Sequence, residues 1–342
     1  MNLGTGSPKR VGLALGYDGR MNVKEMTECM REAEARGFEM GFFSETIELM
    51  RDSVTALAAF GLATRTMRLG ATQVVRLRTP VIMAQTLASL DELAAGRVVL
   101  VVGACTETHA MRHGLEPLDP TQTLAEYIEV IRRLVAGDSV THAGQFVRLD
   151  NVRLSWKPIR AAPPIWVSAT SPRGLRLAGR VADGVLLNSV ASPEYAANAI
   201  RILRSAVEKA GRNWEAFEVA QLVNCSVENN RASALEAIRW EVATKFSPSQ
   251  LPFNARSRLA VGEPHIKPED LPMFVEAYQA GGKEALAASI PISYLEGLTA
   301  SGTPEQVLER VDRYRRAGVN LPLLRPAARH QLETLLTLFA PS

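Results

Sequence analysis

One pattern recurs along the chain and constrains its fold more than any other feature: a stretch with helical periodicity, a glycine, and a short run of β-forming residues. It occurs in MTECMREAEARGFEMGFF, AQTLASLDELAAGRVVLVVGA, GLRLAGRVADGVLLNSV and VLERVDRYRRAGVNLPLL. Glycine tolerates the left-handed conformation that ends many helices. The apolar run after it suits a strand covered on both faces. Each copy therefore predicts one helix–strand unit.

Counted over the whole chain, the strand candidates number eight and alternate with helices. They are residues 11–16, 40–44, 67–75, 97–104, 164–169, 184–190, 217–227 and 319–325. This alternation predicts an α/β fold, a (β/α)8 TIM barrel that occupies residues 1–342 as a single domain with rim insertions. The alternative is a doubly wound open sheet, but its glycine-rich fingerprint follows the first strand, whereas LGTGS precedes it here.

Two segments interrupt the alternation. Residues 246–298, between the seventh and eighth strands, contain six prolines and one short helix expected near 269–280. On the catalytic rim of a barrel, an insertion of this length is typical of a lid, although a packed surface excursion is the alternative. Residues 137–164 predict a β-hairpin that turns near Ala143 and Gly144.

Charge and cysteine usage exclude several classes of protein. The 39 basic and 36 acidic residues leave a net charge of +3 without a basic run, so we expect no nucleic-acid partner. No window approaches the ~20 apolar residues that cross a bilayer, so we expect no membrane contact and a cytoplasmic protein. Cys29, Cys105 and Cys225 are far apart, which indicates neither a disulfide framework nor a zinc site.

Polar residues follow most of the predicted strands, and in a TIM barrel these positions line one shared mouth. They are residues 16–18, 44–46, 72–74, 103–107, 168–171, 188–189 and 224–225. The turn Ser168–Ser171 precedes Pro172 at a helix start, where backbone N–H groups can bind a phosphate. An ordinary Ser-Pro cap without a ligand is the alternative reading.

Glu45 and Glu107 are the candidate carboxylates for acid–base chemistry at this mouth, and solvated carboxylates are the alternative. His109 and His113 lie four residues apart, but no HExxH pattern accompanies them, so we expect no metal. His109 is instead a candidate for contact with a substrate or cofactor. Cys105 has no obvious histidine partner and is expected to be a small packing residue.

Several longer stretches resemble a known family over nearly the whole chain. They are AEARGFEMGFFSE, RDSVTALAAFGLATRTMRLGATQVVRLRTPVIMAQTLASLDELAAGRVVLVVGA, PPIWVSATSPRGLRLAGRVADGVLLN, VEKAGRN and SGTPEQVLERVDRYRRAGV. The chain resembles the bacterial luciferase-like superfamily of flavin- and deazaflavin-dependent oxidoreductases. It is most similar to the branch that includes methylenetetrahydromethanopterin reductase. That branch implies coenzyme F-420, a deazaflavin, and hydride transfer to or from a carbonyl, imine or activated alkene of a small molecule.

The resemblance also implies roles for individual residues. It assigns Glu45 to the deazaflavin or substrate face, and in a deazaflavin-dependent enzyme we expect Glu45, with Glu107 or His109 as further candidates, to handle the proton. It assigns cofactor contacts to strand-end residues, namely Ser44, Gln73, Val74, Gly103, Ala104, Cys105, Ser168, Ala169, Thr170, Ser171 and Gly174. At Gln73–Val74 the family often has a bulge with a cis peptide bond. Relatives commonly form homodimers, which the apolar stretch VTALAAFGLA would allow.

One departure from the family pattern bears on function. Many relatives have Asp-His where this chain has Glu45-Thr46, so a histidine that often serves as proton donor is missing. Three functions therefore stay open: a coenzyme F-420-dependent reductase or dehydrogenase, an FMN-dependent monooxygenase, and a barrel that binds a cofactor without turnover.

Overall fold

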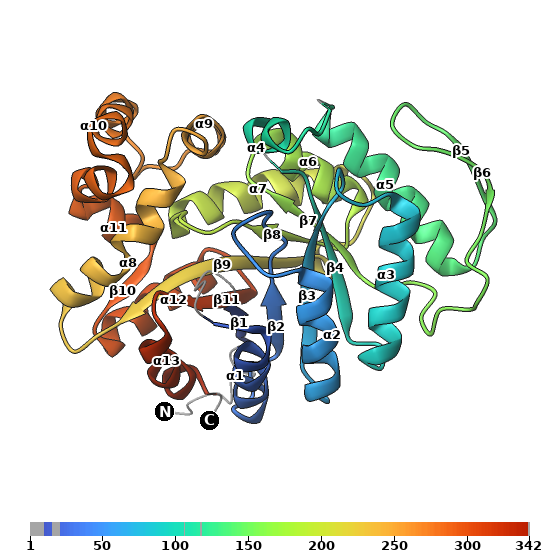
Figure 1. Cartoon of the computed structure of the whole chain (residues 1–342), viewed down its shortest axis with the longest axis horizontal. Coiled ribbons are helices and arrows are strands. Elements are labelled where there is room, and N and C mark those ends of the chain that lie inside the picture. Colours follow the sequence, from blue (N-terminus) through green and yellow to red (C-terminus); the bar gives the residue numbers. More distant parts are fainter. Residues whose placement is uncertain (1–9, 16–20, 106, 117, 341–342) are drawn as a thin grey trace.

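The computed structural model describes residues 10–15, 21–105, 107–116 and 118–340, and its centre is a closed barrel of eight parallel strands (Figure 1). In order around the barrel they are β1 (Gly12–Leu15), β2 (Met40–Phe43), β3 (Arg68–Val74), β4 (Val98–Gly103), β7 (Ile165–Ala169), β8 (Gly184–Leu187), β9 (Glu218–Val227) and β11 (Leu321–Pro326). Strand β9 pairs with both β8 and β11, which closes the ring. The predicted TIM barrel and its eight strands are confirmed.

Helices cover the outside of the barrel. They are α1 (Val23–Ala35), α2 (Ser53–Ala63), α3 (Pro80–Leu93), α4 (Glu107–Arg112), α5 (Pro120–Ala136), α6 (Pro172–Val181), α7 (Pro193–Lys209), α8 (Arg231–Lys245), α9 (Leu251–Val261), α10 (Leu271–Ser289), α11 (Ile292–Leu298), α12 (Pro304–Arg316) and α13 (Leu332–Phe339). Single 3-10 turns lie at η1 (Trp214–Ala216), η2 (Pro268–Asp270) and η3 (Arg329–Gln331). A short strand, β10 (Ala300–Gly302), pairs with the last residues of β9, Cys225–Val227.

The helix ends follow local signals in the sequence. Five helices begin with a capping residue and then proline, which has no N–H to leave unpaired at the first helical position. These starts are Thr79-Pro80, Asp119-Pro120, Ser171-Pro172, Ser192-Pro193 and Thr303-Pro304. Gly37, Gly96 and Gly318 have positive φ just after α1, α3 and α12, as the recurring pattern predicts.

The pattern is wrong at α6, where the glycine has another task. This helix ends at Ala182 in an extended conformation, and Gly184 is already the first residue of β8. A Cβ at Gly184 would lie 2.7 Å from the carbonyl oxygen of Glu218 and from Nε1 of Trp166. Glycine is therefore required at position 184, because Glu218 and Trp166 leave no room for a Cβ.

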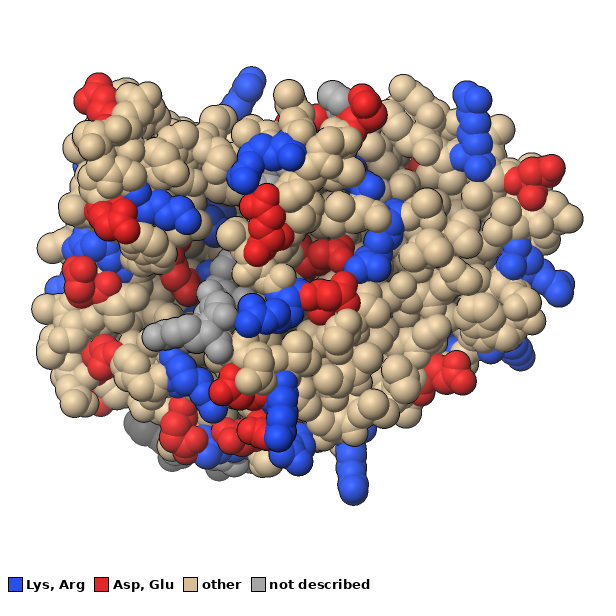
Figure 2. Space-filling model, in the orientation of Figure 1, with Lys and Arg blue, Asp and Glu red and all other residues tan. Residues whose placement is uncertain are grey.

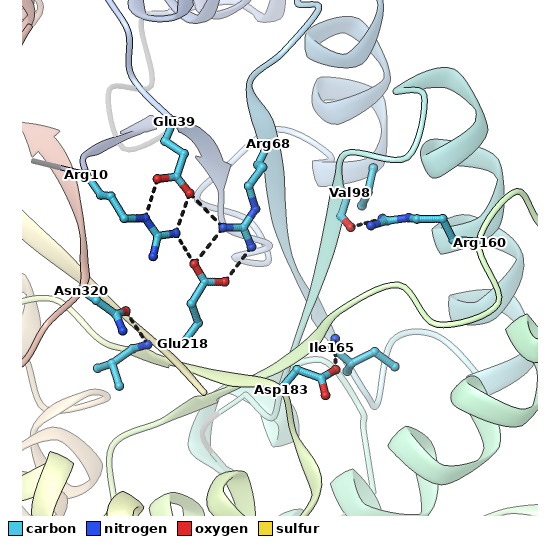
Figure 3. Close-up of polar contacts among 10 residues, drawn as sticks. Arg10, Glu39, Arg68, Val98, Arg160, Ile165, Asp183, Glu218 and Asn320 are labelled. Carbon is cyan, nitrogen blue, oxygen red and sulfur yellow. Dashed lines mark hydrogen bonds and ion pairs between the residues drawn. The ribbon is translucent and has the colours of Figure 1, made fainter. Parts of the chain in front are cut away.

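Four charged side chains close the N-terminal end of the barrel (Figure 3). Arg68 binds Glu218 with two parallel hydrogen bonds, Nη1 to Oε1 at 2.8 Å and Nη2 to Oε2 at 2.7 Å. Arg10 donates to both oxygens of Glu39, at 2.6 and 2.5 Å, and also contacts Glu218. The Arg68 guanidinium lies 5.5 Å from the ring centroid of Trp166, inside the barrel. This end of the barrel is thus held by ion pairs.

The carboxyl ends of the strands open toward the insertion 246–298, which Figure 1 shows as helices α9 to α11 beside and above the barrel. Its apolar residues form a second core around Phe246, Phe274 and Tyr294, whose ring centroids are 5.2–5.4 Å apart. The helix predicted near 269–280 is the first part of α10, which breaks at Gly281 and Gly282. Helices α9 and α11 were not predicted.

The predicted hairpin is confirmed as β5 (Val140–Ala143) and β6 (Arg148–Val152), a separate antiparallel pair at the edge of the molecule (Figure 1). No helix in the part of the chain that the structure describes is long and apolar enough to cross a bilayer.

Candidate active site

A hollow opens at the carboxyl ends of the barrel strands, where the strand-end residues were predicted to meet. Strands β2, β3, β4 and β7 supply one wall, and α8 and α9 supply the opposite one. Seven residues predicted for the site line it: Ser44, Glu45, Val74, Gly103, Ala104, Cys105 and Ser168. Residues 16–18, which were expected at the same mouth, lie outside the described residues.

Unpartnered hydroxyl groups are the main polar feature of the barrel wall. The side chains of Ser44, Thr46, Thr72 and Ser168 all line the hollow. Their hydroxyls make no hydrogen bond to any other residue within the described ranges. Each hydroxyl can donate one hydrogen bond and accept two. The wall is therefore ready to bind a ligand that has both donors and acceptors.

Glu45 is the carboxylate of this wall, and its oxygens already accept four hydrogen bonds. Oε1 accepts from Nε and Nη2 of Arg78, at 3.2 and 2.8 Å, and from Ser53 Oγ at 3.3 Å. Oε2 accepts from the backbone N–H of Val74 at 2.8 Å. The side chain is only 10% exposed. Glu45 therefore connects the end of β2 to the end of β3. To donate a proton to a ligand, it would first have to give up one of these hydrogen bonds.

The expectation for the end of β3 is wrong in two respects. There is no bulge, because β3 and β4 stay in register through Gln73 opposite Val102 and Val74 opposite Gly103. No peptide bond between described residues is cis. Side chains alternate along a strand, so Thr72 and Val74 face the hollow while the buried Gln73 points to the outside of the barrel. Gln73 is thus not in a position to contact a ligand in the hollow.

Glu107 and His109 begin α4, beside the mouth. Glu107 does not line the hollow, and its half-exposed carboxylate pairs with Arg76 at 2.7 Å. The predicted pair of carboxylates across the mouth is therefore not formed. The structure does not describe the His109 side chain, and His113 pairs with Glu48 at 2.9 Å. Among the described residues, no group of three or more His, Cys, Asp or Glu side chains is placed to hold a metal ion.

The turn Ser168–Ser171, predicted to bind a phosphate, contains one residue that lines the hollow and one that caps a helix. Ser168 lines the hollow, whereas Ala169 and Thr170 are buried beside it. Ser171 caps α6 by accepting a hydrogen bond from the N–H of Gly174 at 3.2 Å. The cap is therefore present as in the alternative reading, and the phosphate contact stays a prediction.

Cys105 lies half-buried in the wall. Burial raises the pKa of its thiol, although the charge of Arg76 opposes the shift. A thiolate is the nucleophilic form of cysteine, so a raised pKa disfavours nucleophilic chemistry here. Cys225 is fully buried on β9, and burial likewise raises its pKa.

The opposite wall was missed by the sequence analysis. It consists of Thr244 and Lys245 at the end of α8 and of Gln250, Phe253 and Asn254 around the start of α9. Phe253 is 41% exposed and lines the hollow. These residues belong to a proline-rich segment without a clear period, so only their tertiary position shows that they face the barrel.

A buried arginine holds this wall against the barrel. Arg258 of α9 is 1% exposed and donates to the carbonyl oxygen of Ser189 at 2.6 Å and to Oδ1 of Asn254 at 2.7 Å. Burial lowers the pKa of Arg258. The next residue of the β8 loop, Val190, has φ of +56°, a strained conformation for a β-branched side chain. Arg258 thus links the pocket residue Asn254 to a strained strand end.

The family of the chain follows from a comparison with known sequences. The profile of the luciferase-like monooxygenase family matches residues 1–321. The chain belongs to this family.

Individual relatives within the luciferase-like family are informative. The chain is 28% identical to a 5,10-methylenetetrahydromethanopterin reductase of Archaeoglobus fulgidus, over 87% of this chain and 88% of the relative. It is 30% identical to a coenzyme F-420-dependent glucose-6-phosphate dehydrogenase of Nakamurella multipartita, over 72% and 76%. The fold is similar to that of the coenzyme F-420-dependent tetrahydromethanopterin reductase of Methanopyrus kandleri, with a TM-score of 0.84, 21% identity and 98% of both chains covered. The predicted resemblance is confirmed.

Proposed function

We propose that this luciferase-like protein is a coenzyme F-420-dependent oxidoreductase. It transfers a hydride between the cofactor and a carbonyl, imine or activated alkene of a small molecule. The relatives named above support the cofactor, because two of the three are described as dependent on coenzyme F-420. The substrate is a separate matter, since relatives at about 28–30% identity differ in what they act on.

The observation that carries the proposal is the set of unpartnered hydroxyls at the barrel mouth. Hydrogen-bond donors and acceptors come from the hydroxyls of Ser44, Thr46, Thr72 and Ser168. Gly103 and Ala104 also line the hollow, and their small side chains leave room for a ligand. A deazaflavin ring has carbonyl and N–H groups along one edge and a flat body. These hydroxyls and the small residues between them support binding of such a ring.

When bound, the cofactor supplies two-electron hydride chemistry. The protein orients the cofactor and substrate, excludes water and supplies a proton. We assign orientation to the hydroxyl wall and to Phe253, whose exposed ring lies on the facing side. Reduction of a carbonyl also needs a proton. Lys245 and Glu45 are the described charged residues that line the hollow, and Glu45 is engaged with Arg78. We therefore propose that one of these two side chains supplies the proton.

The insertion 246–298 acts in this proposal as the lid predicted from the sequence. Helix α9 supplies Phe253 and Asn254 to the hollow, and Arg258 anchors the same helix to Ser189. A ligand in the hollow would lie between the barrel and α9 and would be shielded from water on that side.

Fluorescence titration of the purified protein with oxidised coenzyme F-420 tests the proposal, using Thr72→Val/Ser168→Ala and the surface control Ser139→Ala. Losing two hydroxyl contacts, at roughly 1 kcal/mol each, should weaken binding by at least about tenfold. The control should bind like the wild type, because Ser139 lies on the exposed hairpin side and bonds Asn151. Equal affinity of all three proteins would refute the proposed ring site. Oxygen uptake with reduced FMN, without any use of reduced coenzyme F-420, would instead show a monooxygenase.

A further inference from the structure

A second large hollow lies outside the barrel mouth. It is a groove of about 580 Å³ between α6 and α7 on the outer surface, and Val261 at the end of α9 closes one side. None of its lining residues lines the hollow at the barrel mouth. The groove is therefore a separate feature, which the function proposed above does not use.

The rims of the groove carry four exposed cations. Arg176 and Arg180 lie on α6, and Arg201 and Lys209 lie on α7. No carboxylate lines the groove, and none of the four cations forms an ion pair with another residue in the described ranges. Arg201 contacts only the neutral side chain of Asn198. The positive charge of the groove is thus uncompensated.

Some exposed arginines elsewhere pair with carboxylates, as Arg316 does with Glu309 at 2.6 Å and Arg313 with Glu194, whereas others, such as Arg31 and Arg256, have no ion pair among the described residues. The groove differs from these isolated cases because it brings four such cations around one hollow. On the face shown in Figure 2, acidic and basic side chains lie intermixed. Even on the other side of α6, Arg173 pairs with Asp119. On α6 the uncompensated charge therefore lies on Arg176 and Arg180, which border hollows on both the α5 and the α7 side.

The floor of the groove is apolar. The lining of the groove includes the apolar residues Ile202, Ala206, Ala210 and Val261, beside the neutral polar residues Asn198 and Ser205. Residues four apart on a helix face the same way and lie about 6 Å apart, which applies to Arg176 and Arg180 on one rim. Arginine pairs with this spacing suit phosphate or carboxylate oxygens, which guanidinium groups bind with paired hydrogen bonds.

We propose that the α6–α7 groove binds a small organic anion that carries two or more phosphate or carboxylate groups on an apolar or aromatic body. The cations of both rims bind the anionic groups, and the apolar floor receives the body. The size of the groove agrees, since its volume of about 580 Å³ lies within the range of about 300–1,000 Å³ that is common for pockets of small organic ligands.

Isothermal titration calorimetry of the full chain tests the groove with three probes: ATP, inorganic tripolyphosphate and citrate. ATP combines an aromatic body with several phosphates, and we expect it to bind more tightly than tripolyphosphate. Tighter binding of citrate than of both phosphates would assign the site to carboxylates. Binding should weaken as salt is added, because the rim cations are exposed.

The variant Arg176→Ala/Arg180→Ala should bind the preferred probe at least tenfold more weakly. Both side chains are exposed and make no described ion pair, so its melting temperature should match that of the wild type. Arg148→Ala/Arg153→Ala, which removes two exposed arginines of the hairpin region, is the matched control and should bind normally. Arg201→Gln gives an independent reading from the other rim and should also weaken binding.

Three results would overturn the proposal. One is no binding of any probe to the wild type at low salt. Another is equal affinity of the wild type and the Arg176→Ala/Arg180→Ala variant, which would place the anion elsewhere. The third is tight binding of an acidic amphipathic peptide when none of the small anions binds, which would make the groove a protein-docking surface.

Discussion

The ion pairs at the N-terminal end of the barrel (Figure 3) allow a quantitative prediction for Glu218→Gln. The substitution replaces a carboxylate that binds Arg68 twice, at 2.7 and 2.8 Å, and also contacts Arg10. Glutamine keeps one acceptor oxygen but turns an NH2 group toward a guanidinium. Both positive side chains would then depend on Glu39 alone.

The expected loss of stability follows from the burial of the pair. Breaking a fully buried ion pair costs about 3–5 kcal/mol, whereas exposed pairs contribute about 1 kcal/mol or less. The side chains of Glu218 and Arg68 are 20% and 26% exposed, which places them between these limits. We therefore expect a loss of about 2–3 kcal/mol. For a chain of 342 residues, that loss lowers the melting temperature by roughly 3–4 °C.

Differential scanning calorimetry measures this loss against a matched control, Glu309→Gln. Glu309 pairs with Arg316, but the two side chains are 63% and 60% exposed, so this variant should melt within about 1 °C of the wild type. Equal melting temperatures for the two variants would refute the reasoning, because the Glu218 network would then contribute no more than a surface pair.

The same network predicts a dependence on pH. Burial alone would raise the pKa of Glu218, but the hydrogen bonds and charges of Arg68 and Arg10 outweigh it and lower the pKa. A lowered pKa in the folded state stabilises the protein above the unfolded-state pKa of about 4.3. This contribution is lost as the pH falls further, through the folded-state pKa. The difference in melting temperature between wild type and Glu218→Gln should therefore be constant near neutral pH and shrink in acid; a difference that grows in acid would contradict the assignment.

Three further predictions concern the barrel mouth. Glu45→Gln should weaken binding of coenzyme F-420 and lower the turnover rate together, because it loosens Arg78; a lower rate with unchanged binding would show that Glu45 acts only as the acid. Arg258→Met should weaken cofactor binding by roughly tenfold, about 1.4 kcal/mol, with partial rescue in Arg258→Lys, and unchanged titrations would refute its positioning role. Cys105→Ser should keep the wild-type rate, because burial raises the pKa of the thiol; inactivation in steady-state assays would contradict this.

The barrel could be predicted because its signals are local. Apolar runs indicate strands, and Ser-Pro or Thr-Pro pairs indicate helix starts, from a few neighbouring residues. Eight strands alternating with helices are compatible with few topologies. Local signals mislead where one residue type serves two purposes, as glycine does at helix ends and at close contacts. The pattern predicts a helix end at Gly184, whereas Gly184 is a strand residue that has no room for a Cβ beside Glu218 and Trp166.

The site was less predictable, because it depends on partners far apart in the sequence. Glu45 could be placed at the mouth, but its contact with Arg78 joins positions 33 residues apart and was not foreseen. Gln73 was assigned to the ring although the alternation of side chains along a strand places Thr72 there instead. Arg258 and Phe253 lie in an insertion without periodicity, so no sequence signal indicated that one is buried and the other lines the hollow.

Hydride transfer with coenzyme F-420 at the barrel mouth is tested most directly by following oxidation of the reduced cofactor. The purified protein is mixed anaerobically with reduced coenzyme F-420 and a panel of small carbonyl, imine and activated-alkene compounds, and the visible band of the oxidised cofactor is followed. We predict that the band appears with at least one class of substrate, and that the rate falls in Thr72→Val/Ser168→Ala but not in Ser139→Ala. A protein that binds the cofactor equally well in all three forms and oxidises it with none of the substrates would contradict the claim.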